Sequence, residues 1–369
     1  MQTRSSLFKT IRPGAAGIAR RVLLVLPATL ALPAAALPPR RLQFPRDHGA
    51  HPDMRTEWWY LTGALSAQDK DYGFQITFFR SRVEGTQAMQ SRFAAKQLVF
   101  AHAALTDVQG KKLLHDQRIA REGFGVAQMS VTDTDVALRD WSLKRDAKGY
   151  SAIASGPTFA LSLQLAETQP LLLQGKDGLS RKGPDAKQAS YYYSKPQLKV
   201  SGSVTLAGKP MVATGTAWLD HEWSEELLHP DAVGWDWIGM NLDDGSALTA
   251  FRLRRKDADV ANDASLWDGG SFRTASGQQF GFSPGEVVFS PQRFWTSPIS
   301  KARYPVEWIV RTPTNFYTVK AVIDNQELDS RASTGAIYWE GLSDLFDSNG
   351  KKVGRGYLEM TGYAAPLRL

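Results

Sequence analysis

A ten-residue segment in the middle of the chain, Thr214–Trp223, has a simpler copy near the C-terminus. The copy, Gly354–Gly362, keeps the glycine, aromatic, leucine and acid positions, but Met360-Thr361-Gly362 stands where the first copy has His-Glu-Trp. A motif that recurs within a longer, similarly ordered pattern is typical of a duplicated structural unit. We therefore expect two related domains, with the reactive side chains on the first copy only.

The repeat includes the strands before each motif. Both halves open on a tryptophan-rich stretch, Glu57–Leu65 and Trp235–Leu242, and continue with a Phe-Arg pair and a tyrosine-containing strand. A length of 369 residues suits two domains. We predict an N-terminal domain over residues 42–228 and a C-terminal domain over residues 229–369, separated at the turn His229-Pro230-Asp231.

Short stretches of alternating apolar and polar residues recur along the chain, as in Gly73–Arg80 and Phe159–Leu165. Alternation with a period of two, bounded by turn residues, predicts antiparallel strands. Gln68–Asp71 and Leu206–Lys209 fit hairpin turns. The prediction is an all-β protein of two tandem, lipocalin-like antiparallel β-barrels, a fold whose interior commonly holds one small apolar ligand.

Few and short helices are expected in this fold. The two candidates are Ala94–Gln97 and Ser224–Leu228.

Residues 1–36 have the features of an export signal. Arg20 and Arg21 precede the apolar run Val22–Leu37, which two prolines interrupt, and Ala34-Ala35-Ala36 offers a cleavage site. The run is shorter than the roughly 20 apolar residues that cross a bilayer. We therefore predict a periplasmic or secreted protein that has no stable membrane insertion after cleavage.

The positive charge of the chain is concentrated in that same segment. The formal net charge is +7, and residues 1–36 contain five basic residues and no acid, which leaves a net charge of two for the rest. This balance gives no electrostatic case for a nucleic-acid partner. The chain has no cysteine, which excludes disulfides and thiolate chemistry.

Strand alternation divides the first motif between two faces. Trp218, Asp220 and Glu222 share one face, while His221 and Trp223 share the other. His221 is the natural proton carrier near neutral pH, with Asp220 and Glu222 as its carboxylate partners. The alternative is structural, with the carboxylates bonding to backbone groups and the indoles packing at the domain junction.

Two further residues are candidates for catalysis. His102 shares a face with Phe100 in an apolar run, so we expect it inside a barrel, either as an acid or base or as a hydrogen-bonded core residue. Glu57 shares a face with Trp59, and an acid that points into a barrel needs a shifted pKa or a cation such as Arg80.

The candidate ligand-binding residues are aromatic and either line a ligand cavity or brace the barrel cores. Successive tyrosines on one strand alternate in direction, so at least one of the three in the tyrosine triplet faces inward. The set is Trp218, Trp223, Trp59, Tyr60, Phe79, Tyr191, Tyr192, Tyr193 and Trp237.

A loop with Asp47, His48, His51 and Asp53 could supply ligands to a divalent metal. Two histidines on an irregular segment are weak support for such a site, which would need a further ligand from elsewhere. We predict a loop that caps the mouth of the barrel, and neither a metal nor another cofactor.

Several stretches resemble the AttH/CrtC-like family of "predicted secreted hydrolases", and together they extend over nearly all of the chain after the signal. They are Phe44–Pro52, Thr56–Tyr60, Phe100–Asp107, Tyr191–Ser194, Trp218–Trp223 and Gly234–Trp237. The resemblance implies two lipocalin-like domains, an exported Gram-negative protein, and a link to ABC-type export components that handle lipid-like substrates.

Distant relatives implied by this resemblance are carotenoid 1,2-hydratases, which protonate an isoprenoid alkene and add water. Their His-x-Trp would correspond to His221 and Trp223, but the acid that they use on a following strand has no counterpart in Ser246–Leu253. The nucleophile motif Gly-x-Ser-x-Gly of hydrolases is also absent.

Three functions follow as hypotheses. The first is a protein that binds an apolar or amphipathic, lipid- or isoprenoid-like small molecule. The second is a hydratase, isomerase or hydrolase on such a substrate, with His221 as acid or base and Trp223 stabilising a developing cation. The third is a non-catalytic interaction module of the cell envelope, with both barrels filled by side chains.

Overall fold

The structure, a computed structural model, describes residues 36–256 and 265–367. Within these ranges, twenty-three strands form two antiparallel sheets, and helical structure is confined to two single-turn 3-10 helices, η1 (Arg46–His48) and η2 (Glu84–Thr86). The all-β prediction is confirmed. The two predicted helices are wrong: Ser224 continues strand β13, and Gln97 begins strand β3 after an irregular approach.

The first sheet has thirteen strands, all from the chain before Ala232. In the order in which neighbours pair, they are β4 (Lys112–Arg121), β3 (Gln97–Asp107), β2 (Lys70–Arg82), β1 (Thr56–Ala67), β13 (Lys209–Glu226), β12 (Ala189–Leu206), β9 (Phe159–Ala166), β8 (Gly149–Ser155), β7 (Trp141–Asp146), β6 (Asp135–Leu138) and β5 (Ala127–Met129), with β10 (Leu172–Leu173) and β11 (Leu179–Arg181) beside β12.

The second sheet has ten strands from the rest of the chain. Its order is β17 (Gln279–Phe282), β16 (Ser265–Arg273), β15 (Ala247–Arg255), β14 (Ala232–Leu242), β23 (Lys352–Met360), β22 (Ala336–Phe346), β20 (Phe316–Ala321), β19 (Arg303–Arg311) and β18 (Val288–Thr296), with β21 (Glu327–Ser330) beside β22.

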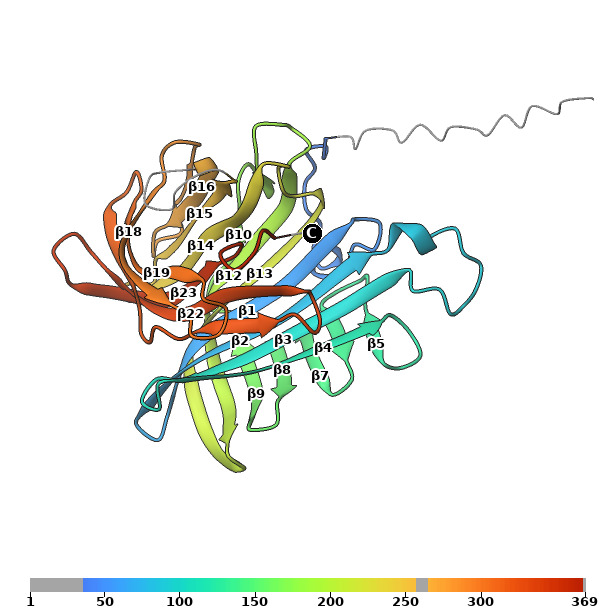
Figure 1. The fold of residues 1–369 in the computed structure, drawn as a ribbon, viewed down its shortest axis with the longest axis horizontal. Helices are drawn as coiled ribbons and strands as arrows, with labels where there is room; N and C mark the ends of the chain where they lie inside the picture. The colour runs from blue at the N-terminus through green and yellow to red at the C-terminus, as the bar shows by residue number, and fades with distance from the viewer. Residues whose placement is uncertain (1–35, 257–264, 368–369) are drawn as a thin grey trace, which may run out of the picture. The chain divides into compact units, whose positions relative to one another are not determined.

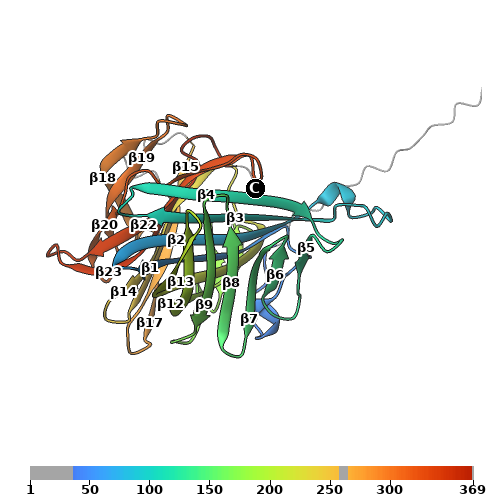
Figure 2. The ribbon, with the colours of Figure 1, turned by 90° about the horizontal axis from the view of Figure 1, so that it is seen from below.

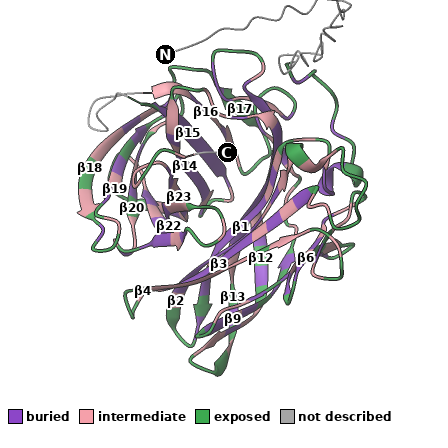
Figure 3. Ribbon diagram, turned by 45° about the vertical axis from the view of Figure 1, so that its right-hand side comes forward, coloured by how far each residue is buried: buried purple, intermediate pink, exposed green. Residues whose placement is uncertain are grey.

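Each sheet curves around its own hydrophobic core, so the two form successive lipocalin-like barrels (Figure 1 and Figure 2). The first interior is filled by aliphatic and aromatic side chains such as Phe74, Trp141 and Leu163, and the second by others such as Trp308 and Leu358. Figure 3 shows that burial follows the strands, while the connections are largely exposed. In the described ranges we find no helix with the length and hydropathy that a membrane crossing requires.

The chain passes from one sheet to the other between Glu226 and Ala232. The domain limits at residues 228 and 229 stay a prediction, and the predicted signal lies outside the described residues. Both predicted hairpin turns are present. Gln68-Asp69 and Ala207-Gly208 each have two positive φ angles (50° and 59°, and 49° and 77°), as tight turns between twisted strands require.

The internal repeat is visible as the same buried ion pair in both barrels. Glu57 on β1 lies opposite Arg80 on β2, and Asp236 on β14 lies opposite Arg252 on β15. In both pairs the guanidinium Nε lies 2.8 Å from the carboxylate. The opening hairpins of the two barrels, β1–β2 and β14–β15, are therefore equivalent.

Strand register corrects the sequence alignment of the two motifs by two residues. Trp223 pairs with Glu57 of the first barrel, and Met360 pairs with Asp236 of the second. Counting back along each strand, Glu359 corresponds to Glu222. The alignment of the two motifs by sequence had matched Glu359 to Asp220.

Candidate functional site

Strand β13 presents the first motif to two different environments. Trp59, His221 and Trp223 point into the first barrel, where they are fully buried. Asp220 and Glu222 point outward, into a cavity between the two barrels. The predicted alternation is confirmed, but it separates His221 from the two carboxylates that we had expected as its partners.

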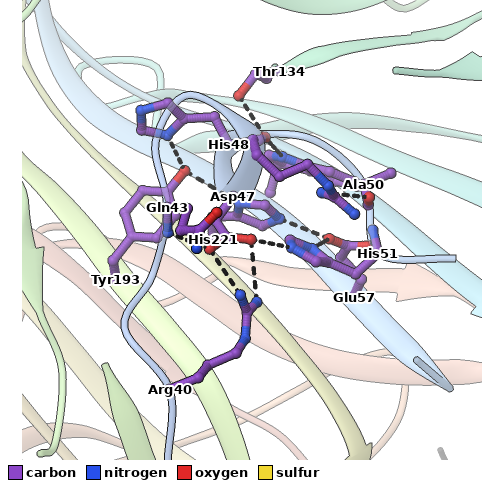
Figure 4. Close-up of polar contacts among 12 residues, drawn as sticks. Arg40, Gln43, Asp47, His48, Ala50, His51, Glu57, Thr134, Tyr193 and His221 are labelled. Atoms are coloured by element: carbon purple, nitrogen blue, oxygen red, sulfur yellow. Dashed lines mark hydrogen bonds and ion pairs between the residues drawn. The ribbon is translucent and has the colours of Figure 1, made fainter. Parts of the chain in front are cut away.

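Inside the first barrel, Glu57 is the centre of a buried polar network (Figure 4). Its Oε1 lies 2.7 Å from His51 Nδ1 and 2.9 Å from His221 Nε2. Its Oε2 accepts hydrogen bonds from the His51 backbone N–H and from Arg80 Nε, both at 2.8 Å. Burial alone would raise the pKa of Glu57, but the hydrogen bonds from His221 and His51 hold this pKa well below its usual range.

The network continues into the segment that precedes β1. His51 Nε2 lies 3.0 Å from Asp47 Oδ1, and Asp47 also accepts hydrogen bonds from Arg40 and from the Gln43 backbone. Both ring nitrogens of His51 thus lie at hydrogen-bond distance from carboxylate oxygens. Its ring stacks on Trp223 at 3.9 Å. This loop is folded against the end of the barrel by charge pairing.

The other end of the network is a chain of neutral donors. His48 Nδ1 lies 2.7 Å from the Tyr193 hydroxyl, which lies 3.2 Å from His221 Nδ1. Burial lowers the pKa of His221 to about 4, although the bond to Glu57 opposes this shift, and burial lowers the pKa of His48 to about 2. Both imidazoles are therefore neutral at pH 7, and His221 donates to Glu57 while accepting from Tyr193.

His51, Glu57 and His221 also form a donor set of the kind that binds zinc, with their ligand atoms within 4.8 Å of one another. The set is already satisfied by its own hydrogen bonds. Arg80, whose Nε lies 2.8 Å from Glu57, adds a positive charge that opposes binding of a divalent cation. The arrangement fits a structural proton and ion-pair network better than a metal centre.

The cavity between the barrels is lined by residues of both sheets, and its space open to water-sized molecules is about 100 Å³. Its walls are mostly aromatic and aliphatic, with one lysine and four carboxyl groups. The lining residues are Trp58, Tyr60, Phe79, Lys182, Tyr192, Asp220, Glu222, Leu227, Leu228, Trp235, Trp237, Phe251, Leu253, Glu340 and Glu359.

On the first-barrel side, Asp220 is held by three donors. Oδ1 accepts hydrogen bonds from Ser194 Oγ at 2.5 Å and from Trp218 Nε1 at 2.7 Å, and Oδ2 accepts one from the Tyr192 hydroxyl at 2.8 Å. Burial nevertheless raises the pKa of Asp220 to about 7, and the neighbouring Glu222 adds to this effect. Asp220 is therefore an acid that exchanges its proton near neutral pH.

Glu222 is compensated by the one cation of the cavity. Lys182 Nζ lies 2.9 Å from Glu222 Oε1. The same ammonium group lies 4.4 Å from the ring centroid of Phe251 and 4.7 Å from that of Tyr192. Aromatic faces thus already stabilise a positive charge in this cavity.

On the second-barrel side, Glu340 and Glu359 are direct cross-strand neighbours on β22 and β23. Burial raises the pKa of both, and the proximity of the two carboxyls raises it further for Glu340. Glu340 and Tyr60 are buried next to each other at the cavity wall. Burial raises the pKa of both groups, while the interaction between them lowers the pKa of Glu340 and raises that of Tyr60.

The charges of this cavity do not balance. Asp220, Glu222, Glu340 and Glu359 contribute four carboxyl groups, and Lys182 neutralises one of them. The three carboxyls that remain, Asp220, Glu340 and Glu359, are ionised only at high cost, so the pKa of each is raised toward or above neutral pH. The cavity can therefore donate a proton to an apolar ligand and stabilise a positive charge over its aromatic rings.

The predicted site residues divide between the two places and the packing around them. Tyr60, Phe79, Tyr192, Asp220, Glu222 and Trp237 line the inter-barrel cavity. Trp218 donates a hydrogen bond to Asp220, and the ring centroids of Trp218 and Trp237 lie 6.4 Å apart. Trp59, Glu57, Tyr193, His221 and Trp223 belong to the buried network of the first barrel, with Tyr191 packed beside Trp223.

His102 is not inside a barrel, contrary to our expectation. The interior of the first barrel takes the alternate residues of β3, Val99, Ala101 and Ala103. His102 faces the second barrel instead, where Nδ1 lies 2.8 Å from the Tyr338 hydroxyl and Nε2 lies 2.9 Å from Ser333 Oγ. Burial lowers the pKa of His102 to about 3, so it is a neutral hydrogen-bonding residue of the interface.

Sequence reasoning missed the acids of the second barrel. Glu359 lies in the second motif, which we expected to be free of chemistry, and Glu340 lies on the strand beside it. Lys182 and Phe251 were also missed. Aligning the two motif strands on the buried Glu57–Arg80 and Asp236–Arg252 pairs matches Glu359 with Glu222. This alignment would have indicated Glu359 as an acid on the outward face.

The chain is similar in sequence and in fold to known proteins. The profile of a family described as AttH-like matches residues 35–363. A crystal structure of a Nitrosomonas europaea protein described as an AttH is 48% identical, with a TM-score of 0.82, and the match covers 89% of this chain and 99% of that one. No curated protein sequence matches the chain.

More remote similarity extends to two other solved structures. Kievitone hydratase from Nectria haematococca is 13% identical with a TM-score of 0.67, and the match covers 88% of this chain and 94% of that one. CghA is 12% identical with a TM-score of 0.50, over 84% and 89% of the two chains. At these identities the similarity shows the shared two-barrel fold.

Proposed function

The chain belongs to the AttH-like family, and on that premise we propose that it binds an unsaturated, largely apolar small molecule between its two barrels and protonates it, as a hydratase or isomerase does. One observation carries this proposal. The cavity combines buried carboxylic acids that hold protons near neutral pH with aromatic walls and almost no compensating cation. The fold accommodates such chemistry, since kievitone hydratase has the same architecture.

The proposed reaction begins with proton transfer from the Glu340–Glu359 pair. The O–H proton goes to one carbon of the alkene, whose π electrons form the new C–H bond and leave a cation on the other carbon. The rings of Trp58, Trp237 and Phe251 stabilise this charge. Water then adds to the cation and releases a proton. For an isomerase, the cation instead loses a proton from a neighbouring carbon.

Asp220 is suited to receive the proton that is released. Its carboxylate oxygens already accept hydrogen bonds from Ser194, Trp218 and Tyr192, which orient it and stabilise the ionised form. Its pKa of about 7 allows it to hold or release a proton at working pH. A proton then returns from Asp220 through water to the acid pair, and the site is restored.

His221, our first choice as acid or base from the sequence, has a different role in this proposal. It is fully buried inside the first barrel, where its two nitrogens bond to Glu57 and Tyr193. Its contribution is to hold strand β13 in place, so that Asp220 and Glu222 point outward. We assign it as a positioning residue.

The test is incorporation of solvent hydrogen into carbon. The purified protein is incubated in D2O with a panel of isoprenoid and fatty alkenes, and mass spectrometry measures deuterium bound to carbon and the gain of one water. We expect incorporation by the wild type, and a loss of about 100-fold or more in Glu340→Gln, Glu359→Gln or Asp220→Asn, because a positioned general acid or base typically contributes at least that factor.

Glu327→Gln is the matched control. Glu327 is a buried carboxyl of the second barrel that accepts hydrogen bonds from Ser297 and Tyr304, away from the cavity. The Glu327→Gln variant should incorporate deuterium at the wild-type rate per folded molecule. If the cavity variants incorporate deuterium as fast as Glu327→Gln, the assignment of the acids is wrong.

We also propose, from the sequence alone, that residues 1–36 direct export to the periplasm and that the ligand passes to or from an ABC-type export system. The support is the basic and apolar pattern of that segment together with the family resemblance. Cell fractionation with N-terminal sequencing tests export. Recovery of the whole chain in the cytosol, with its N-terminus uncleaved, would contradict it.

A further inference from the structure

An exposed aromatic pair lies at the end of the first barrel where β2 leads into β3. Phe93, in the β2–β3 connection, and Phe124, in the β4–β5 connection, are 65% and 49% exposed. Their rings stack with centroids 5.5 Å apart and an interplanar angle of 13°. Met89, in the same connection as Phe93, is 51% exposed. The β2–β3 connection, which contains η2, projects beyond the strand ends (Figures 1 and 2).

The turn that carries Phe124 has an unfavourable backbone. Gly123, Phe124 and Gly125 have φ angles of 100°, 59° and 70°. A bulky residue in the left-handed region costs about 1–2 kcal/mol. Burial of the Phe124 side chain does not offset this cost, because about half of it is in solvent. Backbone strain of this kind is concentrated at binding sites.

Two arginines surround the aromatic pair. The Arg121 guanidinium lies 4.1 Å from the Phe124 ring centroid, and that of Arg92 lies 5.6 Å from the same centroid. In the described ranges, neither arginine forms an ion pair with a carboxylate. The acid Glu84 in this connection is already paired with Arg82. Glu122, next to Arg121, is an exposed acid at this surface. The surface therefore combines apolar side chains with two arginines and one acid.

We propose that this end of the first barrel docks on an anionic phospholipid surface. Met89, Phe93 and Phe124 enter the headgroup region, while Arg92 and Arg121 contact lipid phosphates. Aromatic side chains are enriched at membrane interfaces, and an apolar patch combined with cations gives reversible binding to anionic lipid. The barrel docks on the surface and does not cross the bilayer.

The position of this surface suits a protein with an apolar ligand. Phe79, which lines the inter-barrel cavity, lies three residues before the end of β2, and Leu227 of the cavity follows the end of β13. Strand direction places both at the same end of the barrel as Phe93. Docking thus brings this side of the cavity toward the lipid. The docking itself is independent of the proposed chemistry.

The test is sedimentation with vesicles, one set of phosphatidylglycerol and phosphatidylcholine and one of phosphatidylcholine alone. The variants are the pair Phe93→Ser with Phe124→Asn, since asparagine tolerates a positive φ, and the pair Arg92→Gln with Arg121→Gln. The matched control is Ile299→Ser with Phe316→Ser, which removes side chains that are 65% and 56% exposed on the second barrel. All proteins carry the same N-terminus, verified by mass spectrometry.

We expect the wild type and the control to bind the anionic vesicles equally. The aromatic pair variant should bind at least roughly tenfold more weakly, and the arginine pair variant roughly 20-fold more weakly. Circular dichroism verifies folding. Equal binding of the aromatic variant and the control, or no preference of the wild type for anionic vesicles, overturns the proposal. So does a change in self-association of the aromatic variant, measured by sedimentation velocity, without a change in vesicle binding.

Discussion

Glu57 on β1 is fully buried and Glu359 on β23 is partly buried at the wall of the cavity, and their pKa values shift in opposite directions. Glu57 accepts four hydrogen bonds from His51, His221 and Arg80, so its pKa falls. Burial raises the pKa of Glu359, and the nearby carboxyls of Asp220 and Glu222 raise it further. Burial acts to raise the pKa of both carboxyls, so the opposite net shifts come from the larger number of donors around Glu57.

The network around Glu57 and the cavity around Glu359 therefore suit different roles. The network around Glu57 is charge-balanced and closed to solvent, which suits a role in holding the first barrel together. The cavity around Glu359 and Asp220 has four carboxyl groups and one lysine, and this excess of acid suits proton transfer. In the function that we propose, the reactive face of the motif is the face opposite to His221.

The largest effect should come from breaking the balanced network. We predict that Glu57→Gln loses about 3–5 kcal/mol of unfolding free energy, because it leaves Arg80 buried without its carboxylate. Chemical denaturation monitored by circular dichroism measures this. A folded, stable variant that had lost only deuterium incorporation would show instead that Glu57 is catalytic.

The acid pair of the cavity should respond in the opposite sense. At pH 8, Glu340→Gln with Glu359→Gln should gain on the order of 1–3 kcal/mol of unfolding free energy, because the wild type must then either ionise buried carboxyls or hold protons that the unfolded chain has released. The same denaturation experiment applies. A loss of stability at pH 8 would mean that the pair is stabilising and well compensated.

The pH dependence of stability should differ between the two regions. The pKa of Asp220 is about 7 in the folded protein against a usual value of 3.8. Its contribution to the free energy of unfolding is therefore complete below pH 4 and is lost as the pH rises toward 7. Glu57 has a lowered pKa, so its contribution is present above its usual value of 4.5 and is lost as the pH falls. Asp220→Asn should flatten the decline between pH 5 and pH 7 in unfolding titrations. An unchanged slope would contradict the raised pKa.

The smallest effect should distinguish two buried tryptophans on the same strand. Trp218 Nε1 donates a hydrogen bond to Asp220 at 2.7 Å, whereas Trp223 Nε1 has no partner among the described residues. Trp218→Phe should cost about 1 kcal/mol more than the matched change Trp223→Phe. It should also move the midpoint of the Asp220 titration to higher pH, which NMR of the labelled carboxyl can follow. Equal behaviour of the two variants would exclude a role of Trp218 at Asp220.

Much of the fold could be predicted from the chain. Period-two alternation determined the strands, and Gln68-Asp69 was recognisable as a tight turn although it contains no glycine. The two faces of β13 were also predicted. The cavity was not, because Glu340 and Glu359 meet Asp220 only when one barrel packs on the other, and no local pattern encodes that contact. His102 was misplaced for the same reason, since the outward face of β3 is apolar where the second barrel covers it.

The central claim is that the carboxyls of the inter-barrel cavity are protonated near neutral pH, whereas Glu57 is not. Infrared spectroscopy of the protonated carboxyl C=O band measures this directly, with the wild type, Glu57→Gln and the triple variant Asp220→Asn, Glu340→Gln, Glu359→Gln titrated between pH 5 and pH 9. We predict that the wild type shows this band at pH 6 and loses part of it as the pH passes about 7. The triple variant should lack the band. A wild type without the band at pH 6, or a band that disappears in Glu57→Gln and persists in the triple variant, would contradict the account.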